Sequence, residues 1–362
     1  MRVQAAILRD PGKPFTVEDL QLGEPGPGEV LVRVAGVGMC HTDVLFRSLP
    51  ELPMPMVFGH EGSGVVEAVG PGVTRVKVGD HVVMSYDSCG WCAQCLTGAA
   101  PYCDEFMARN LSGVRTDGTS GATDLGGGPV AARWFGQSSF ATHAVATERN
   151  LVTVHPSLPL ELLGPLGCGM QTGAGSVLNA LNVRPGSSIA VFGTGAVGLA
   201  AVMAAKVAGA DEIVAIDLHA GRRELAMELG ATRAIDGADP DLAALTGEVD
   251  YSFDTTGVPG VVRTAVGVLS PRGTCGLVGT GGGDITLEPL ALAGRSLRYI
   301  LEGDVVPQEF IPRLIRLWQH GRFPFDRLIR TYPLDEINDA ERDSASGATI
   351  KPVLRPRAGV SP

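Results

Sequence analysis

Residues 187–198 read SSIAVFGTGAVG, a short apolar run that passes directly into a glycine-rich turn. The apolar run has the composition of a buried strand. An Ala/Val-rich stretch at 198–208 predicts a helix after the turn, and EIVAIDL at 212–218 predicts a second strand. Strands that alternate with helices in this way build parallel sheets from βαβ units. The segment 170–304 is therefore predicted to form a doubly wound α/β domain with a parallel sheet.

The glycine-rich turn has the spacing G-x-G-x-x-G. In this setting Gly193 permits the tight turn, Gly195 lets the backbone approach a pyrophosphate, and Gly198 lets the following helix pack against the sheet. The helix N-terminus then faces the phosphates. Asp217 ends the next strand and is placed to bind a ribose diol, which favours NAD, although the arginines at 222–223 keep NADP open. Another nucleotide, or none, is the alternative. The cofactor contacts predicted in this segment are Gly193, Gly195, Ala196, Val197, Gly198, Asp217 and Arg222.

The first 150 residues show a different sequence pattern. Short β-branched runs, such as 30–34 and 64–69, are each bounded by Gly or Pro, which predicts an irregular β-rich domain. After about residue 305 the chain offers a helix at 309–320 and a last strand-like run, KPVLRP, at 351–356. We therefore expect the α/β domain to be inserted into the β-rich one. The predicted domains are 1–169 plus 305–362 for the β-rich domain and 170–304 for the α/β domain.

Composition excludes several classes of partner. The 362-residue chain has a formal net charge of −10, so no broad basic surface is expected for nucleic acid or anionic lipid. The N-terminal MRVQAAILRD does not resemble a signal peptide, and no apolar run is long enough to span a bilayer. Four of the seven cysteines lie between residues 89 and 103, as metal ligands in a reducing compartment would. We expect a cytoplasmic protein whose partner is a small molecule.

Those four cysteines form one motif, C-x2-C-x2-C-x7-C, made by Cys89, Cys92, Cys95 and Cys103. Zinc bound by four thiolates is tetrahedral and closed to substrate, so the motif predicts a structural zinc in a lobe of about residues 87–105. A nucleic-acid-binding zinc ribbon is disfavoured because the chain is acidic. An iron–sulfur cluster remains an alternative, since it also uses four cysteines.

A second set of candidate ligands is scattered along the chain. Cys40 lies among polar residues in GMCHTD, and His60 and Glu61 lie between glycines in FGHEGSG. Cys168 lies in GPLGCGMQTG, at the junction of the two predicted domains. Two thiolates and one imidazole leave one position of a zinc tetrahedron open, as in catalytic zinc sites. The alternative is that these are ordinary buried residues.

These motifs resemble those of a known family. GHE-x-x-G at 59–64, followed by Gly70 and Val73, resembles the signature of the zinc-containing medium-chain alcohol dehydrogenases, and the resemblance spans essentially the whole chain. Four longer runs resemble the aryl-alcohol (benzyl alcohol) dehydrogenase branch. They are PMVFGHEG at 55–62, FGQSSFAT at 135–142, ELLGPLGCGMQTGAGSVLNAL at 161–181 and GRFPFDRLIR at 321–330.

The resemblance implies a GroES-like catalytic domain, a Rossmann cofactor domain and a homodimer or homotetramer joined mainly through the cofactor domains. It also implies catalytic roles. Glu61 corresponds to a carboxylate close behind the metal, Asp43 to the residue that orients the ligating imidazole, and Thr42 to the hydroxyl that accepts the substrate proton. The residues that correspond to the catalytic zinc ligands are Cys40, His60 and Cys168.

Further roles follow from the same resemblance. His41 and Lys351 correspond to basic positions near the cofactor pyrophosphate, and Thr172 corresponds to a residue beside the nicotinamide. The positions that line the alcohol pocket in the family correspond to Ser85, Trp134 and Phe135; core packing of the two aromatic residues is the alternative.

One position departs from the family pattern. Several members carry a histidine three residues beyond the relay hydroxyl, which passes the proton to solvent, whereas this chain has Leu45 there. The relay must therefore end differently, through His41 or through water.

Together these observations predict a zinc-dependent oxidoreductase with two zinc ions per chain. The predicted reaction interconverts primary aromatic or allylic alcohols and their aldehydes by hydride transfer to and from NAD. The alternatives are a dehydrogenase of thiol adducts of the formaldehyde type, a general aliphatic alcohol dehydrogenase, or a non-catalytic protein that binds zinc and NAD.

Overall fold

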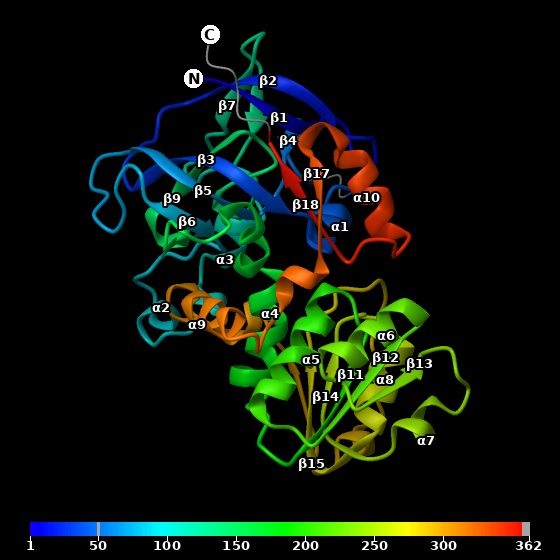
Figure 1. Cartoon of the computed structure of the whole chain (residues 1–362). Coiled ribbons are helices and arrows are strands. Elements are labelled where there is room, and N and C mark those ends of the chain that lie inside the picture. The colour runs from blue at the N-terminus through cyan, green and yellow to red at the C-terminus, as the bar shows by residue number, and fades with distance from the viewer. Residues whose placement is uncertain (49–50, 357–362) are drawn as a thin grey trace. The chain divides into compact units, whose positions relative to one another are not determined.

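The computed structural model describes residues 1–48 and 51–356, which form two compact units (Figure 1). The first unit contains Met1–Cys168, Val306–Pro312 and the chain from Asp326 onward. The second contains Gly169–Val305 and Arg313–Phe325. The second unit is thus inserted into the sequence of the first.

The first unit is built on two groups of strands. A small closed barrel has the order β1-β2-β7-β8-β4, and a seven-stranded sheet has the order β10-β6-β5-β3-β18-β17, with β9 also paired to β3. The barrel strands are β1 (Arg2–Leu8), β2 (Thr16–Leu22), β4 (Met56–Val57), β7 (Gly121–Asp124) and β8 (Pro129–Ala131). The sheet strands are β3 (Glu29–Gly38), β5 (Glu61–Val69), β6 (His81–Met84), β9 (His143–Thr147), β10 (Leu151–Val154), β17 (Ile329–Pro333) and β18 (Lys351–Arg355).

Strand β3 lies at the centre of this sheet and is buried along most of its length, as its apolar sequence EVLVRVAGVG requires. It pairs with β5 so that Gly38 is opposite Glu61, and with β18 so that Gly38 is opposite Val353. Three segments far apart in the sequence therefore meet at the end of β3. The helices of this unit are short: α1 (His41–Phe46), α2 (Ala93–Leu96), α3 (Phe106–Asn110) and α10 (Ile337–Ala345).

The second unit contains a six-stranded parallel sheet with the order β13-β12-β11-β14-β15-β16 (Figure 1). Along the chain, β11 to β13 are added toward one edge of the sheet, and β14 to β16 toward the other. The strand order therefore reverses between β11 and β14. Dinucleotide-binding folds hold their ligand at such a reversal point. The strands are β11 (Ser188–Phe192), β12 (Glu212–Asp217), β13 (Arg233–Asp236), β14 (Val249–Asp254), β15 (Leu269–Leu277) and β16 (Ser296–Tyr299). The helices are α4 (Gly169–Gly175), α5 (Ala196–Ala208), α6 (Ala220–Leu229), α7 (Leu242–Thr246) and α8 (Pro259–Gly267). The predicted parallel α/β sheet is confirmed.

One segment is grouped differently from the sequence prediction. The prediction placed all of 305–362 in the β-rich domain, whereas Arg313–Phe325 belongs to the second unit. Within it, Trp318 packs edge-on against Phe325, and Phe323 and Phe325 are fully buried. Helix α9 (Pro307–Gln319) begins among residues of the first unit and ends among those of the second, so the helical pattern alone did not reveal the boundary.

The packing of α5 against its sheet gives a test of the fold. A Cβ atom added at Gly198 would lie 1.9 Å from the Gly193 carbonyl oxygen, so we predict that Gly198→Ala lowers the free energy of unfolding by about 1 to 3 kcal/mol. Gly221→Ala is the matched control, because a Cβ there meets no atom within 4 Å and alanine favours the helix. Chemical denaturation of both variants measures the difference, and equal stabilities would contradict the close packing.

Candidate functional site

The scattered candidate ligands converge at the end of β3. One ligand atom from each of Cys40, His60, Glu61 and Cys168 can be chosen so that all four lie within 4.8 Å of one another. His60 Nε2 is 3.2 Å from Cys168 Sγ. Cys40 precedes α1, His60 precedes β5, and Cys168 follows a short helical turn, so each ligand lies at the end of a regular element.

The imidazole of His60 is fixed by Asp43. His60 Nδ1 lies 2.8 Å from Asp43 Oδ1, and both side chains are buried. This pairing turns Nε2 toward Cys168, as a metal-ligating histidine requires. Burial alone would lower the pKa of His60, but the charge of Asp43 and its hydrogen bond raise that pKa well above its usual value.

The surroundings of Cys40 favour its thiolate form. The hydrogen bond with Cys168 holds the pKa of the Cys40 thiol well below its usual range, against the effect of burial, and His60 acts in the same direction. A thiolate is the form of cysteine that binds zinc. Two thiolates and one imidazole at these distances fit a zinc ion with one further position for a ligand.

Lys351 lies beside the candidate ligand Glu61. This lysine is only 2% exposed, and its Nζ donates to both carboxylate oxygens of Glu61 at 2.9 Å. Nζ also donates to the Met39 carbonyl at 3.1 Å. The cause is the pairing of β18 with β3, which buries the start of β18 beside the ligand cluster. These three acceptors hold the ammonium group beside Glu61, and the role of Lys351 near the cofactor pyrophosphate stays a prediction.

The three predicted pocket residues are buried, and two of them contact His60 or the Asp43 carboxylate that orients it. Trp134 is fully buried, and its indole N–H donates to Asp43 Oδ1 at 3.0 Å; its place in the alcohol pocket stays a prediction. Phe135 stacks on the ring of His60 with centroids 4.3 Å apart. Ser85 is fully buried and donates to the Gly167 carbonyl at 2.6 Å. The pocket roles of Phe135 and Ser85 stay predictions.

Gln137 is a supporting residue that the sequence analysis missed. Its amide nitrogen donates to the His60 carbonyl at 2.8 Å and to the Ser85 carbonyl at 3.1 Å, and its amide oxygen accepts the Gly62 N–H at 3.1 Å. The side chain is fully buried, so it joins the start of β5 to the end of β6. Its place in FGQSSFAT, a polar residue between aromatic ones, was the available signal.

The predicted relay residues lie on α1. The Thr42 hydroxyl is half-buried and 3.7 Å from Cys40 Sγ. His41 and Leu45 are four residues apart and therefore share one face of the helix. Both are exposed, Leu45 to 37%. The face on which the proton exit was predicted is thus open to solvent.

The four cysteines of the C-x2-C-x2-C-x7-C motif form the second cluster. Cys89, Cys92, Cys95 and Cys103 also have their sulfur atoms within 4.8 Å of one another, and no disulfide links them in the described chain. The Sγ–Sγ distances of 3.9 Å (Cys89–Cys95) and 4.0 Å (Cys92–Cys103) match the edge of about 3.8 Å expected for a ZnS₄ tetrahedron with Zn–S bonds of about 2.3 Å.

Backbone N–H groups point at these sulfur atoms. Cys89 N lies 3.2 Å from Cys103 Sγ, and Cys92 N lies 3.3 Å from Cys89 Sγ. Hydrogen bonds from the backbone of Asp104 and Cys95 lower the pKa of Cys92 to about 6. Burial raises the pKa of Cys103 to about 12. Such a cluster is stable with all four sulfurs deprotonated only when a cation compensates their charge.

In the second unit, the predicted cofactor residues gather at the end of β11. Gly193 has φ +85°, and a Cβ there would lie 2.5 Å from Thr255 Oγ1. Asp217, at the end of β12, accepts the Thr194 N–H at 2.7 Å. Arg222 lies 3.8 Å from Asp217, and Thr172 lies on α4 of the same unit. Ala196 and Val197 begin α5, whose N-terminus is preceded by Gly195.

Thr255 supports this turn and was also missed. Its hydroxyl donates to the Phe192 carbonyl at 3.1 Å and to the Gly193 carbonyl at 2.9 Å. It thereby ties the end of β14 to the turn after β11, the two strands between which the sheet order reverses. The sequence DTTG offered no local sign of this role.

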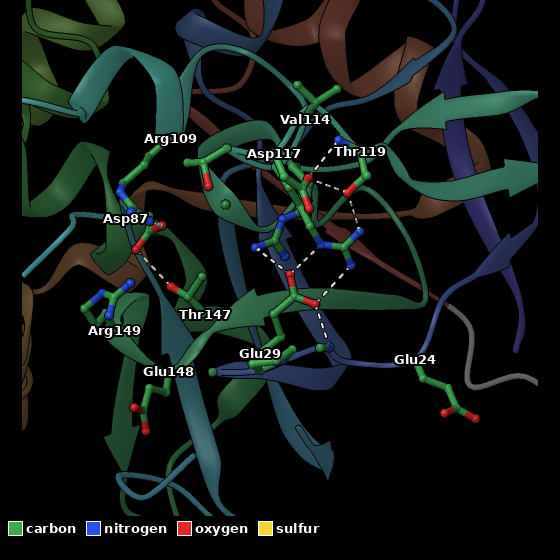
Figure 2. Close-up of a pocket in the computed structure, with 17 residues that line it drawn as sticks. Glu24, Glu29, Asp87, Arg109, Val114, Asp117, Thr119, Thr147, Glu148 and Arg149 are labelled. Carbon is green, nitrogen blue, oxygen red and sulfur yellow. Dashed lines mark hydrogen bonds and ion pairs between the residues drawn. The ribbon is translucent and has the colours of Figure 1, made fainter. Parts of the chain in front are cut away.

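A cavity of about 510 Å³ in the first unit is lined by residues other than the predicted metal ligands (Figure 2). Its charged groups are largely paired: Arg115 donates to both oxygens of Glu29 at 2.6 and 3.0 Å, and Arg109 contacts Asp87 at 3.1 Å. Ligand sites for small organic molecules are mostly apolar, so we interpret this network as a structural one.

Comparisons with known proteins agree with this arrangement. The family model described as the alcohol dehydrogenase GroES-like domain matches residues 26–156, and the one described as zinc-binding dehydrogenase matches residues 196–319. A geraniol dehydrogenase of Castellaniella defragrans is 49% identical over 97% of both chains. An NDMA-dependent alcohol dehydrogenase of Amycolatopsis methanolica is 38% identical over 98% of this chain and 99% of the relative.

Solved structures give the same result. The alcohol dehydrogenase zinc-binding domain protein from Burkholderia ambifaria is 49% identical with a TM-score of 0.95. The benzyl alcohol dehydrogenase from Acinetobacter calcoaceticus is 44% identical with a TM-score of 0.94. Each comparison covers 98% of this chain and 99% of the other.

A β-rich unit that carries an open cysteine–histidine cluster, together with a Rossmann unit, defines the class of zinc-dependent dehydrogenases. The chain belongs to the zinc-containing medium-chain alcohol dehydrogenases. The family resemblance found in the sequence is confirmed. None of the helices in residues 1–48 and 51–356 has the length and apolar composition needed to cross a bilayer.

The Glu29 network predicts a pH dependence of stability. Burial alone would raise the pKa of Glu29, but the hydrogen bond from Arg115 and the charge of Arg133 outweigh it and lower that pKa. The carboxylate therefore stabilises the fold above its unfolded pKa of about 4.3, and this contribution is lost as pH falls through the lower folded pKa. We predict that Glu29→Gln costs about 1.5 to 3 kcal/mol at neutral pH and that this difference shrinks below about pH 4.

Urea denaturation between neutral and acid pH measures this effect. Glu24→Gln is the matched control, since Glu24 lines the same cavity but has no hydrogen bond or ion pair within the described part of the chain. A Glu29→Gln penalty that stays constant with pH would contradict the network.

Proposed function

We propose that this alcohol dehydrogenase uses zinc and NAD to interconvert primary allylic or aromatic alcohols and their aldehydes. The observation that carries the proposal is the gathering of Cys40, His60 and Cys168 around one point, with the His60 imidazole oriented by Asp43. This donor set leaves one zinc position for a substrate oxygen, which a closed four-thiolate site does not.

The protein's own residues have distinct tasks in this reaction. Bound zinc supplies a Lewis acid that lowers the pKa of an alcohol hydroxyl, and bound NAD supplies a hydride acceptor. Thr42, whose hydroxyl lies beside Cys40, is placed to take up the substrate proton. Phe135 covers one face of His60 and keeps water from that side of the ligand.

The substrate class is supported by the relatives. One relative is described as a geraniol dehydrogenase and a structural relative as a benzyl alcohol dehydrogenase. Geraniol is an allylic primary alcohol and benzyl alcohol an aromatic one, so both carry the hydroxyl one carbon from a π-system. NAD use is supported by Asp217, whose negative charge at the end of β12 disfavours a ribose 2′-phosphate.

A substrate panel tests the proposal. Zinc-loaded protein with NAD is mixed at alkaline pH with benzyl alcohol, geraniol and ethanol, and the absorbance of reduced nicotinamide is followed. We expect a higher kcat/KM for the first two alcohols than for ethanol. Absence of turnover with every alcohol, in protein shown by metal analysis to carry zinc, would contradict an enzymatic role.

Replacing one ligand tests the metal assignment. Cys40→Ser should reduce the zinc content from two ions per chain to one. It should also lower activity by more than about 100-fold, whereas replacement of a residue that only orients a metal ligand typically lowers activity by about 10- to 100-fold. Cys275→Ser is the control, because Cys275 is buried in β15, outside both clusters. A Cys40→Ser protein that keeps both ions and its turnover would remove Cys40 from the site.

A further inference from the structure

We propose that Trp134 is a positioning residue of the open metal centre, whose indole N–H locks the Asp43 carboxylate in the orientation that holds His60. The inference rests on the proposed function, since it takes the cluster of Cys40, His60 and Cys168 to bind zinc. It gives Trp134 a role that differs from both pocket lining and simple core packing.

The hydrogen bonds of Asp43 carry the inference. Its Oδ1 accepts from three groups: His60 Nδ1 at 2.8 Å, Trp134 Nε1 at 3.0 Å and Gly59 N at 3.1 Å. Its Oδ2 accepts the Cys40 N–H at 3.1 Å. Asp43 is 1% exposed and Trp134 has no exposed surface, so water does not replace these donors.

Trp134 differs from the other three donors in its origin. Two of those donors belong to the candidate ligands Cys40 and His60 themselves, and the third, Gly59, is adjacent to His60. Trp134 lies 91 positions from Asp43, on the short turn Trp134–Gly136. It is therefore the donor that ties the carboxylate to a part of the fold that carries no ligand of this cluster.

The indole ring is itself held in place. Its centroid lies 5.6 Å from that of Phe46, 5.1 Å from Phe58 and 5.3 Å from Phe135, in tilted or edge-on arrangements. Aromatic neighbours on several sides restrict rotation of a buried ring. The N–H thus has a fixed direction, and a carboxylate that accepts it is fixed as well.

Loss of this N–H has a defined consequence. Without it, Oδ1 keeps only donors that move with the ligands, so the carboxylate can turn together with the imidazole. Residues that orient a ligating histidine change metal affinity by about 10- to 100-fold when they are replaced. A tryptophan that served only to fill space would affect the stability of the fold and leave the coordination geometry unchanged.

Cobalt substitution tests the proposal. Trp134→Phe keeps an aromatic ring in the cage and removes the N–H. With Co²⁺ in the open cluster, we expect the visible absorption bands to shift relative to the parent and the cobalt to be lost to a chelator about 10- to 100-fold faster. The metal of the Cys89 cluster should be unaffected.

Phe15→Leu is the matched control, because it removes a buried ring that packs on Phe58 and Phe140 and leaves the three rings around Trp134 and its N–H in place. Its cobalt spectrum should match the parent's. The proposal is overturned if Trp134→Phe has the parent's spectrum and release rate, or if Phe15→Leu shows the same changes as Trp134→Phe. If the parent itself takes up no Co²⁺ at the open cluster, the proposed function fails first, and the inference fails with it.

A measurement on the unaltered protein covers the case in which Trp134→Phe does not fold. The chain has three tryptophans, so their indole N–H resonances can be assigned from Trp91 and Trp318 variants. Removal of metal from the open cluster should shift the Trp134 resonance and leave that of Trp318 in place. An unchanged Trp134 resonance would overturn the proposal.

Discussion

The register of β3 against β5 places Gly38 opposite Glu61. The last residue of β3 and the first residue of β5 therefore lie side by side in the sheet. Cys40 follows the first strand and His60 precedes the second, which brings two ligands 20 positions apart into contact range. The approach is close: a Cβ at Gly38 would lie 2.0 Å from Glu61 Oε2. The ligand cluster therefore depends on a strand register and on a glycine that permits it.

The same point of the sheet concentrates buried charge. Asp43, His60, Glu61 and Lys351 are all buried there, and each unpaired charge would cost several kcal/mol. The structure compensates them in two pairs: Asp43 with His60, and Glu61 with Lys351. Burial raises the pKa of Glu61, and Lys351 opposes that rise. The metal centre is thus preorganised by a network whose members are each hydrogen-bonded.

Local sequence patterns predicted the parts of the molecule that local rules govern. The glycine turn at 193–198 and the alternation of strands and helices indicated a parallel sheet, and the cysteine spacing at 89–103 indicated one ligand cluster. The residues of the open cluster were found largely through the family resemblance. The pairing of Lys351 with Glu61 was not predicted, because the two residues lie 290 positions apart, a distance at which no periodicity operates. The hydrogen bonds of Trp134 and Gln137 were not predicted for the same reason, since their partners are set by tertiary packing.

The most direct test of an open zinc site is a crystal structure with anomalous data collected at the zinc absorption edge. We predict one anomalous peak bonded to Cys40 Sγ, His60 Nε2 and Cys168 Sγ with a position left for a non-protein ligand, and a second peak within the Cys89 cluster. A protein that oxidises alcohols but shows no metal among Cys40, His60 and Cys168 would contradict this account of the site.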